Sequence, residues 1–116
     1  MTRHTAARTT KALSGNQLMM LRDMLQEQRR FRVEQLSEAL PPSRTMSAAE
    51  LEVRETVLHG GQLALADVEA ALDRMRNGTY GRCVHCGTRL PVERLEVVPQ
   101  AALCMPCQHR ADNASS

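Results

Sequence analysis

Four cysteines in the last third of the chain have the type and spacing of a metal site. They form two C-x2-C pairs with seventeen residues between them: Cys83, Cys86, Cys104 and Cys107. Thiolates two residues apart can point toward one centre, and two such pairs at this separation are typical of a zinc site. Because four sulfurs fill a tetrahedral coordination sphere, the pattern predicts one structural Zn²⁺ with no open position for substrate or water.

Disulfides and a redox C-x-x-C pair are the other uses of such cysteines. The N-terminus contains no apolar segment that resembles a secretory signal. This predicts a cytoplasmic protein, in which stable disulfides are rare. Two pairs at zinc-finger spacing are seldom two independent redox centres. His85 and His109 lie close to the cysteines in the sequence, but with four thiols present we expect both to lie outside the ligand set.

No other group of residues indicates catalysis. The sequence has no pattern typical of a catalytic triad, a phosphate-binding loop or paired catalytic carboxylates, so we expect no enzymatic activity. The net charge of +2 falls to zero if four thiolates hold one Zn²⁺, so a strong attraction to nucleic acid is not implied. No apolar run approaches the length of about 18 residues that spans a membrane.

Helices are the elements that the composition favours for carrying this site. The chain has 116 residues, enough for about one domain, and only 2% of them are aromatic, whereas Leu, Ala, Val and seven Met supply the apolar side chains. That content suits packed helices better than a sheet. The cysteine segment is too small to fold by apolar burial alone, and bound zinc contributes on the order of 10 kcal/mol to such modules.

Two long helices precede the cysteines. The first is predicted from Asn16, its expected cap, to Leu40, a stretch without Gly or Pro. Pro41 and Pro42 end it, because proline lacks an amide donor and disfavours helical geometry in the residue before it. Its apolar residues form two stripes: Leu18, Leu21 and Leu25, then Val33, Leu36 and Leu40.

The second helix is predicted to begin near Ser47, which forms a capping-box pattern with Glu50, and to end at Asn77-Gly78. Its heptad positions are Leu51, Leu58, Leu65 and Leu72, with Arg54, Gly61, Val68 and Met75 as the complementary set. Two such helices joined by a tight turn bury their stripes against each other as an antiparallel coiled coil. The Gly60-Gly61 pair favours a close helix approach, with a hinge as the alternative.

The expected architecture is therefore mainly α: an antiparallel coiled-coil helical hairpin followed by a small four-cysteine zinc finger. The segments are a disordered basic tail (1–15), the hairpin (16–78) with its tip at 41–46, the finger module (79–110) and a disordered tail (111–116).

The finger sequence YGRCVHCGTRLPVERLEVVPQAALCMPC, preceded by a helical hairpin, resembles the DksA/TraR family of bacterial RNA polymerase-binding regulators. The shared features beyond the cysteines are Tyr80-Gly81, Gly87, Arg94-Leu95-Glu96, Pro99 and Leu103. The resemblance covers about residues 16–110. It implies a monomeric transcription regulator that inserts its hairpin tip into the secondary channel of RNA polymerase, without sequence-specific DNA contact, and in several members acts with the alarmone ppGpp.

The tip departs from the family pattern. The best-studied members carry an acidic D-x-x-D-x-A motif, and counting back from Cys83 places this motif on residues 40–45. The residues that would meet the polymerase are Pro41, Pro42, Ser43, Arg44 and Thr45, and none is acidic. Near a catalytic Mg²⁺ this changes the sign of the local field. We expect channel binding without the acidic-tip effect on initiation.

Two other classes remain open. One is a zinc-ribbon nucleic-acid binder that uses the basic tail and four finger arginines: Arg82, Arg89, Arg94 and Arg110. The other is a coiled-coil adaptor or homodimer without polymerase binding. Salt-dependent DNA binding would indicate the first, and the mass in solution would indicate the second.

Overall fold

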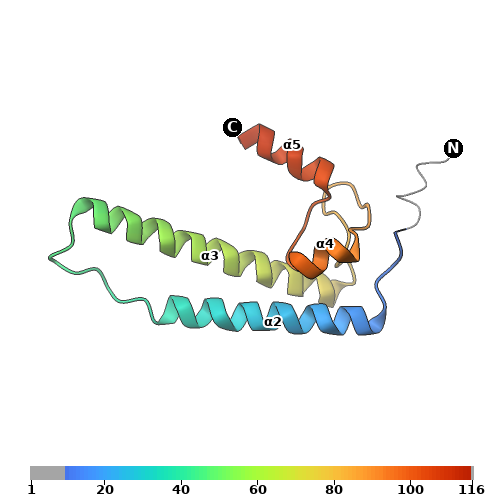
Figure 1. The fold of residues 1–116 in the computed structure, drawn as a ribbon, viewed down its shortest axis with the longest axis horizontal. Coiled ribbons are helices and arrows are strands. Elements are labelled where there is room, and N and C mark those ends of the chain that lie inside the picture. Colours follow the sequence, from blue (N-terminus) through green and yellow to red (C-terminus); the bar gives the residue numbers. More distant parts are fainter. Residues whose placement is uncertain (1–9, 116) are drawn as a thin grey trace.

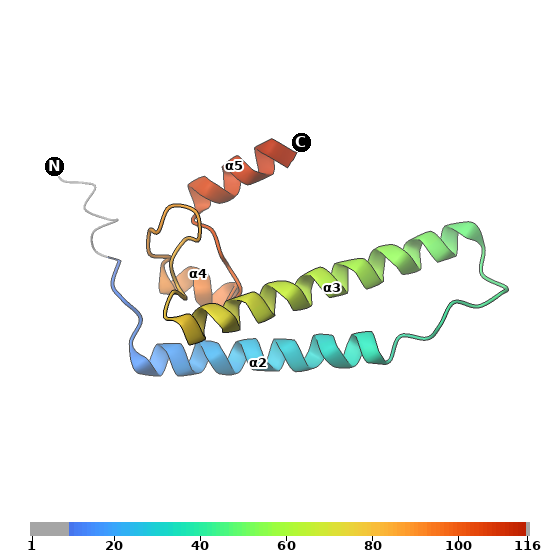
Figure 2. The same ribbon diagram turned by 180° about the vertical axis from the view of Figure 1, so that it is seen from behind.

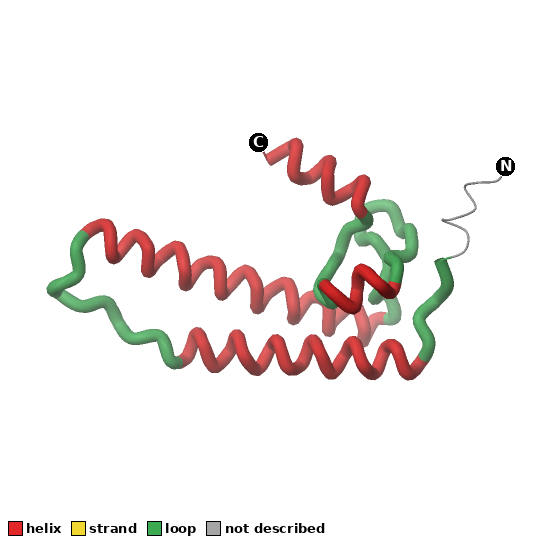
Figure 3. The backbone as a smooth tube through the Cα atoms, in the orientation of Figure 1, coloured by secondary structure: helices red, strands yellow, loops and turns green. Residues whose placement is uncertain are grey.

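The computed structural model describes residues 10–115, and the first nine residues of the predicted basic tail lie outside this range. Two long helices form an antiparallel hairpin, and two short helices belong to the finger at one end (Figure 1). The molecule measures 65 × 34 × 20 Å. No strand occurs in residues 10–115 (Figure 3), so the mainly α architecture is confirmed. The helices are α2 (Gly15–Ser37), α3 (Ala48–Asn77), α4 (Val92–Val97) and α5 (Met105–Ser115).

Capping boxes start both long helices. The Ser47 hydroxyl accepts from the Glu50 amide at 3.1 Å and the Glu50 carboxylate accepts from the Ser47 amide at 2.8 Å, as predicted. These bonds lower the pKa of Glu50. The predicted cap of α2, Asn16, is wrong: Ser14 is the cap, and Gln17 completes the box at 3.1 and 2.8 Å. Ser14 and Gln17 form the S-x-x-Q pattern of a capping box, so the sequence does contain a signal for this helix start.

The segment between the long helices is longer than the predicted tip. Helix α2 ends at Ser37 rather than Leu40, and α3 begins after Ser47, so residues 38–47 connect them. At the other end of α3, Gly78 adopts a left-handed φ of 77°, which ends the helix as predicted. Helix α5 continues to Ser115, so the predicted tail of 111–116 is largely helical.

Burial along the hairpin is uneven. Near the finger, Leu21 and Leu25 of α2 are fully buried, and Val68 and Leu72 of α3 are nearly so. Toward the tip, the stripe residues Val33, Leu40 and Leu51 are exposed. The two helices also diverge in this direction (Figures 1 and 2). The coiled-coil seam is therefore packed at the finger end and open at the tip end.

Gly61 lies where the helices approach closely. It is buried, and a Cβ atom there would lie 3.2 Å from Leu36 Cδ2, whereas a Cβ atom at Gly60 would meet nothing within 4 Å. Helix α3 runs through both glycines without a break. The close-approach explanation therefore accounts for Gly61, and Gly60 faces open space.

Candidate metal centre

The four cysteines come together at the end of the hairpin. Their Sγ atoms all lie within 4.8 Å of one another, and Cys86 Sγ and Cys104 Sγ are 3.7 Å apart. A tetrahedral zinc with Zn–S bonds of about 2.3 Å places its sulfurs about 3.8 Å apart. The donor set and its spacing thus fit one Zn²⁺, and among residues 10–115 these are the residues that gather as a metal-binding group.

Two short backbone structures position the pairs. In the first, the Gly87 amide donates to Cys83 O at 2.9 Å and the Cys83 amide to Thr88 O at 2.8 Å. Gly87 has a φ of 80°, which lets the chain turn tightly after Cys86. In the second, Cys104 directly precedes α5 and Cys107 lies in its first turn. A bond from the Val84 amide to Ala102 O at 2.8 Å ties the two segments together.

The protein environment already favours thiolate at part of the site. Burial raises the pKa of Cys83, but hydrogen bonds from the backbone of Cys104, Cys86 and His85 and from the Cys107 side chain lower it to about 5. Hydrogen bonds with Thr88 lower the pKa of Cys86. Thiolate is the form that binds zinc.

Cys107 behaves in the opposite way. Its burial, together with the neighbouring cysteine sulfurs, raises its pKa to about 12. The Arg110 guanidinium donates to Cys107 Sγ at 3.0 Å, which suits a thiolate. Zinc binds the thiolate form, so its binding at neutral pH is coupled to the release of protons from the cysteine cluster.

The finger packs on the base of the hairpin through a continuous core. The Tyr80 hydroxyl donates to Pro99 O at 2.8 Å, and Arg74 Nη2 donates to Gln100 O and Ala101 O at 3.4 Å. Burial raises the pKa of Tyr80 to about 12. The shared cluster consists of Leu21, Leu25, Val68, Ala71, Leu72, Tyr80, Cys83, Leu90, Leu95, Ala101 and Cys107. The metal thus cross-links segments that also hold the two helices together.

Residues 10–14 extend this packing, although the sequence indicated only a tail there. Leu13 is partly buried against the core, and a Cβ atom at Gly81 would lie 3.2 Å from Leu13 Cδ1. The signal that could have placed it is a single leucine directly before a capping box, the position of a hydrophobic staple.

The other predicted site residues lie away from the cysteine cluster. His85 and His109 are exposed and are not among the clustered metal donors. The tip residues lie at the opposite end of the rod (Figure 2), and all are exposed: Pro41, Pro42, Ser43, Arg44 and Thr45. Arg54 of α3 donates from Nη2 to Leu40 O at 2.6 Å, a contact that holds the tip segment and that the heptad pattern did not reveal.

Fold and site together define a four-cysteine zinc finger joined to a helical hairpin. The prokaryotic dksA/traR C4-type zinc-finger family matches residues 78–113. Residues 78–113 are thus a zinc finger of DksA/TraR type, and the predicted resemblance to the DksA/TraR family is confirmed for this segment. With the clustered cysteines, this also confirms one structural zinc.

Two curated relatives match part of this chain. General stress protein 16O of Bacillus subtilis (strain 168) is 41% identical over 54 residues, which are 47% of this chain and 33% of that protein. An uncharacterized protein of Aquifex aeolicus (strain VF5) is 33% identical over 51 residues, 44% of this chain and 35% of that protein. These matches thus span about a third of each relative.

The fold has a counterpart among solved structures. The structure of transcription factor DksA2 from Pseudomonas aeruginosa superposes with a TM-score of 0.69 and 24% identity, covering 88% of each chain. The hairpin and the finger are therefore arranged in the same fold in both proteins. In residues 10–115, neither long helix is apolar enough to cross a membrane.

Proposed function

We propose that this protein is a transcription regulator that binds bacterial RNA polymerase and inserts its coiled-coil hairpin into the secondary channel to modulate initiation. The observation that carries the proposal is the form of the molecule: a rod with an exposed tip at one end and a metal-stapled finger at the other, in a fold shared with a transcription factor. Zinc has a structural role, and the protein catalyses no reaction. It acts in the cytoplasm as a monomer.

The chemistry of the tip sets the expected mode of action. No acidic residue lies in 40–45, and Arg44 adds a positive charge. The nearest acids are Glu38, Glu50 and Glu52, and Glu50 is engaged in the Ser47 capping box. Residues 40–45 therefore offer no carboxylate ligand to a Mg²⁺ ion. The protein therefore occupies the channel and competes with other factors there, without reproducing the effect of an acidic tip.

The first test is binding of the zinc-loaded protein to purified bacterial RNA polymerase, with competition from a known secondary-channel factor. Competed binding supports the proposal. Binding without competition would place the protein elsewhere on the enzyme, and no binding at micromolar concentration would favour the adaptor class. A solution mass equal to two chains would also favour the adaptor.

A second test concerns the tip directly. The double variant Leu40→Asp/Ser43→Asp restores the two missing acids and should confer effects on promoter-complex lifetime that the wild type lacks. The same assay with and without ppGpp tests whether the alarmone takes part. Unchanged transcription by a variant that still binds polymerase would contradict the proposed role of the tip charge.

A further inference from the structure

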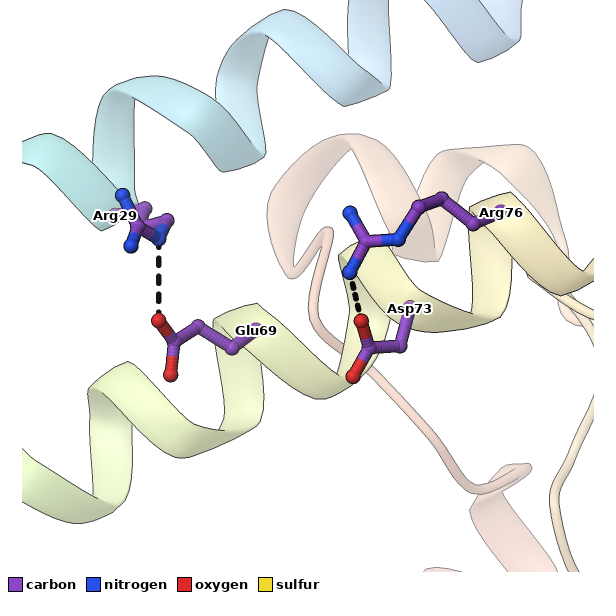
Figure 4. A network of polar contacts seen from close by, with 4 residues as sticks. All are labelled: Arg29, Glu69, Asp73 and Arg76. Atoms are coloured by element: carbon purple, nitrogen blue, oxygen red, sulfur yellow. Dashed lines mark hydrogen bonds and ion pairs between the residues drawn. The ribbon is translucent and has the colours of Figure 1, made fainter.

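Four of the eight arginines on the hairpin pair with acids, and they include those of its main groove. A groove of about 860 Å³ between α2 and α3 is lined by Arg29, Arg30 and Arg76. Arg29 pairs with Glu69 across the helices at 3.1 Å, and Arg76 pairs with Asp73 (Figure 4). Arg30 pairs with Glu27. Each cation has a carboxylate partner, so this groove offers no free positive charge.

The finger presents a different arrangement at Arg82 and Arg89. These residues face each other in an isolated antiparallel bridge. The flanking bonds, Leu90 N to Gly81 O and Cys83 N to Thr88 O, are both 2.8 Å, so Arg82 and Arg89 form the non-hydrogen-bonded pair, in which opposing side chains lie closest. Like charges placed directly opposite each other are destabilising. A nearby anion would remove this cost.

A third cation joins the pair. A hollow of about 180 Å³ is lined by Lys11, Leu13, Tyr80, Arg82 and Arg89, together with backbone glycines, Ala12, Leu18 and Leu90, and by no acid. None of its three cations has an ion pair in residues 10–115. Glu93 lines a neighbouring hollow together with Lys11. We call the hollow of about 180 Å³ the Arg82–Arg89 hollow.

The zinc site does not account for these charges. A zinc ion with four thiolates carries a net charge of about −2, but the arginine bonded to a cysteine sulfur is Arg110, at 3.0 Å from Cys107. Arg94 also has a sulfur partner, because its Nη1 donates to Met105 Sδ at 2.8 Å. Among residues 10–115, Arg82 and Arg89 are therefore the finger arginines for which no charged or sulfur partner is found. Arg82 donates to Gly87 O at 3.3 Å.

We infer that the Arg82–Arg89 hollow binds the phosphodiester backbone of a nucleic acid. Guanidinium forks match the paired oxygens of a phosphate. The chain has no Trp, its one Phe lies on α2, and Tyr80 is buried with its hydroxyl bonded to Pro99 O. Base stacking therefore contributes nothing, and the contact is independent of sequence.

The experiment measures binding of the zinc-loaded full chain to a fluorescent DNA duplex of about 20 base pairs at increasing salt. Three phosphate contacts predict a slope of log affinity against log salt of about −2.7, or a loss of about 40-fold from 50 to 200 mM salt. Arg82→Ala/Arg89→Ala should reduce the slope to about −0.9. The matched control is Arg22→Ala/Arg30→Ala, which removes the same charge from α2 and should leave the slope unchanged.

Each outcome decides the inference. An RNA duplex and a DNA duplex compared side by side distinguish the two sources of the phosphodiester. An equal loss in the control variant would show that net charge alone drives binding, and tighter binding of polyglutamate than of either duplex would assign the hollow to an acidic protein; both results overturn the inference. Zinc content of each variant verifies folding, and polymerase binding is measured separately, so failure here leaves the proposed function standing.

Discussion

The two halves of the rod are built from similar helix sequence but differ in what they pack against. At the finger end, α2 and α3 share one buried core with the finger, which includes Leu25, Leu72 and Leu95. At the tip end the apolar stripes continue, yet Val33 of α2 and Leu51 of α3 remain exposed. The heptad pattern alone therefore does not produce a packed seam. The third packing partner, cross-linked by a metal, is what closes the core.

Loss of the metal should have the largest effect on the difference in packing between the two ends of the rod. Cys83→Ser removes one donor, and because zinc contributes on the order of 10 kcal/mol in such modules, the finger should unfold and leave the base of the rod as exposed as its tip. Zinc content and thermal unfolding by circular dichroism measure the effect. His85→Ala, next to the ligands but outside the cluster, is the control and should keep one zinc.

A matched pair of core and tip variants sharpens the contrast next. Leu25→Ala removes a fully buried side chain and should lower the free energy of unfolding by about 2–5 kcal/mol. Leu51→Ala removes a seam side chain that is 36% exposed and should lower the free energy of unfolding by less, about 1 kcal/mol. Urea unfolding of both variants tests this, and equal losses would mean that the tip half is also packed.

The hydrogen bond between finger and rod gives a smaller effect with a defined pH dependence. Tyr80→Phe removes the bond to Pro99 O and should cost about 1 kcal/mol. Folding raises the pKa of Tyr80 from 10.0 to about 12. This stabilisation is therefore complete below pH 10 and is lost as pH rises through 12.

Unfolding of the zinc-loaded protein between pH 8 and 12 measures that dependence. The Tyr80→Phe variant serves as the reference, because it should lack the component assigned to this phenol. An identical alkaline loss in both proteins would assign the pH dependence to other groups.

Gly60 and Gly61 lie near the middle of α3, between the two halves. Replacing either by alanine should give the smallest change in stability. Gly60→Ala adds a methyl group in open space and should stabilise α3 by up to about 1 kcal/mol. In Gly61→Ala the added carbon would lie 3.2 Å from Leu36 Cδ2, so Leu36 must move. This variant should therefore be stabilised less than Gly60→Ala, or be destabilised. A gain of equal size at both positions would contradict the close approach of the helices at Gly61.

Local signals in the sequence predicted most of the fold and the metal site. These signals act over only a few residues. The two C-x2-C pairs predicted the metal site, the Ser47 capping box predicted the start of α3, and Gly78 predicted its end. The packing of Leu13, the open seam at the tip and the Arg54 contact depend on distant partners. A heptad shows which side of a helix is apolar, but it does not show whether a second surface comes close enough to cover it.

The position of the core has a mechanical consequence. A rod held firmly at one end and free along the rest is a cantilever, so the excursions of its free end grow with distance from the clamp. Local opening of the tip-side turns of α3 exposes no residue of the buried cluster, which places these turns at the low-stability end of the molecule. The packing of the buried cluster at the finger end therefore limits how far the tip moves relative to the finger.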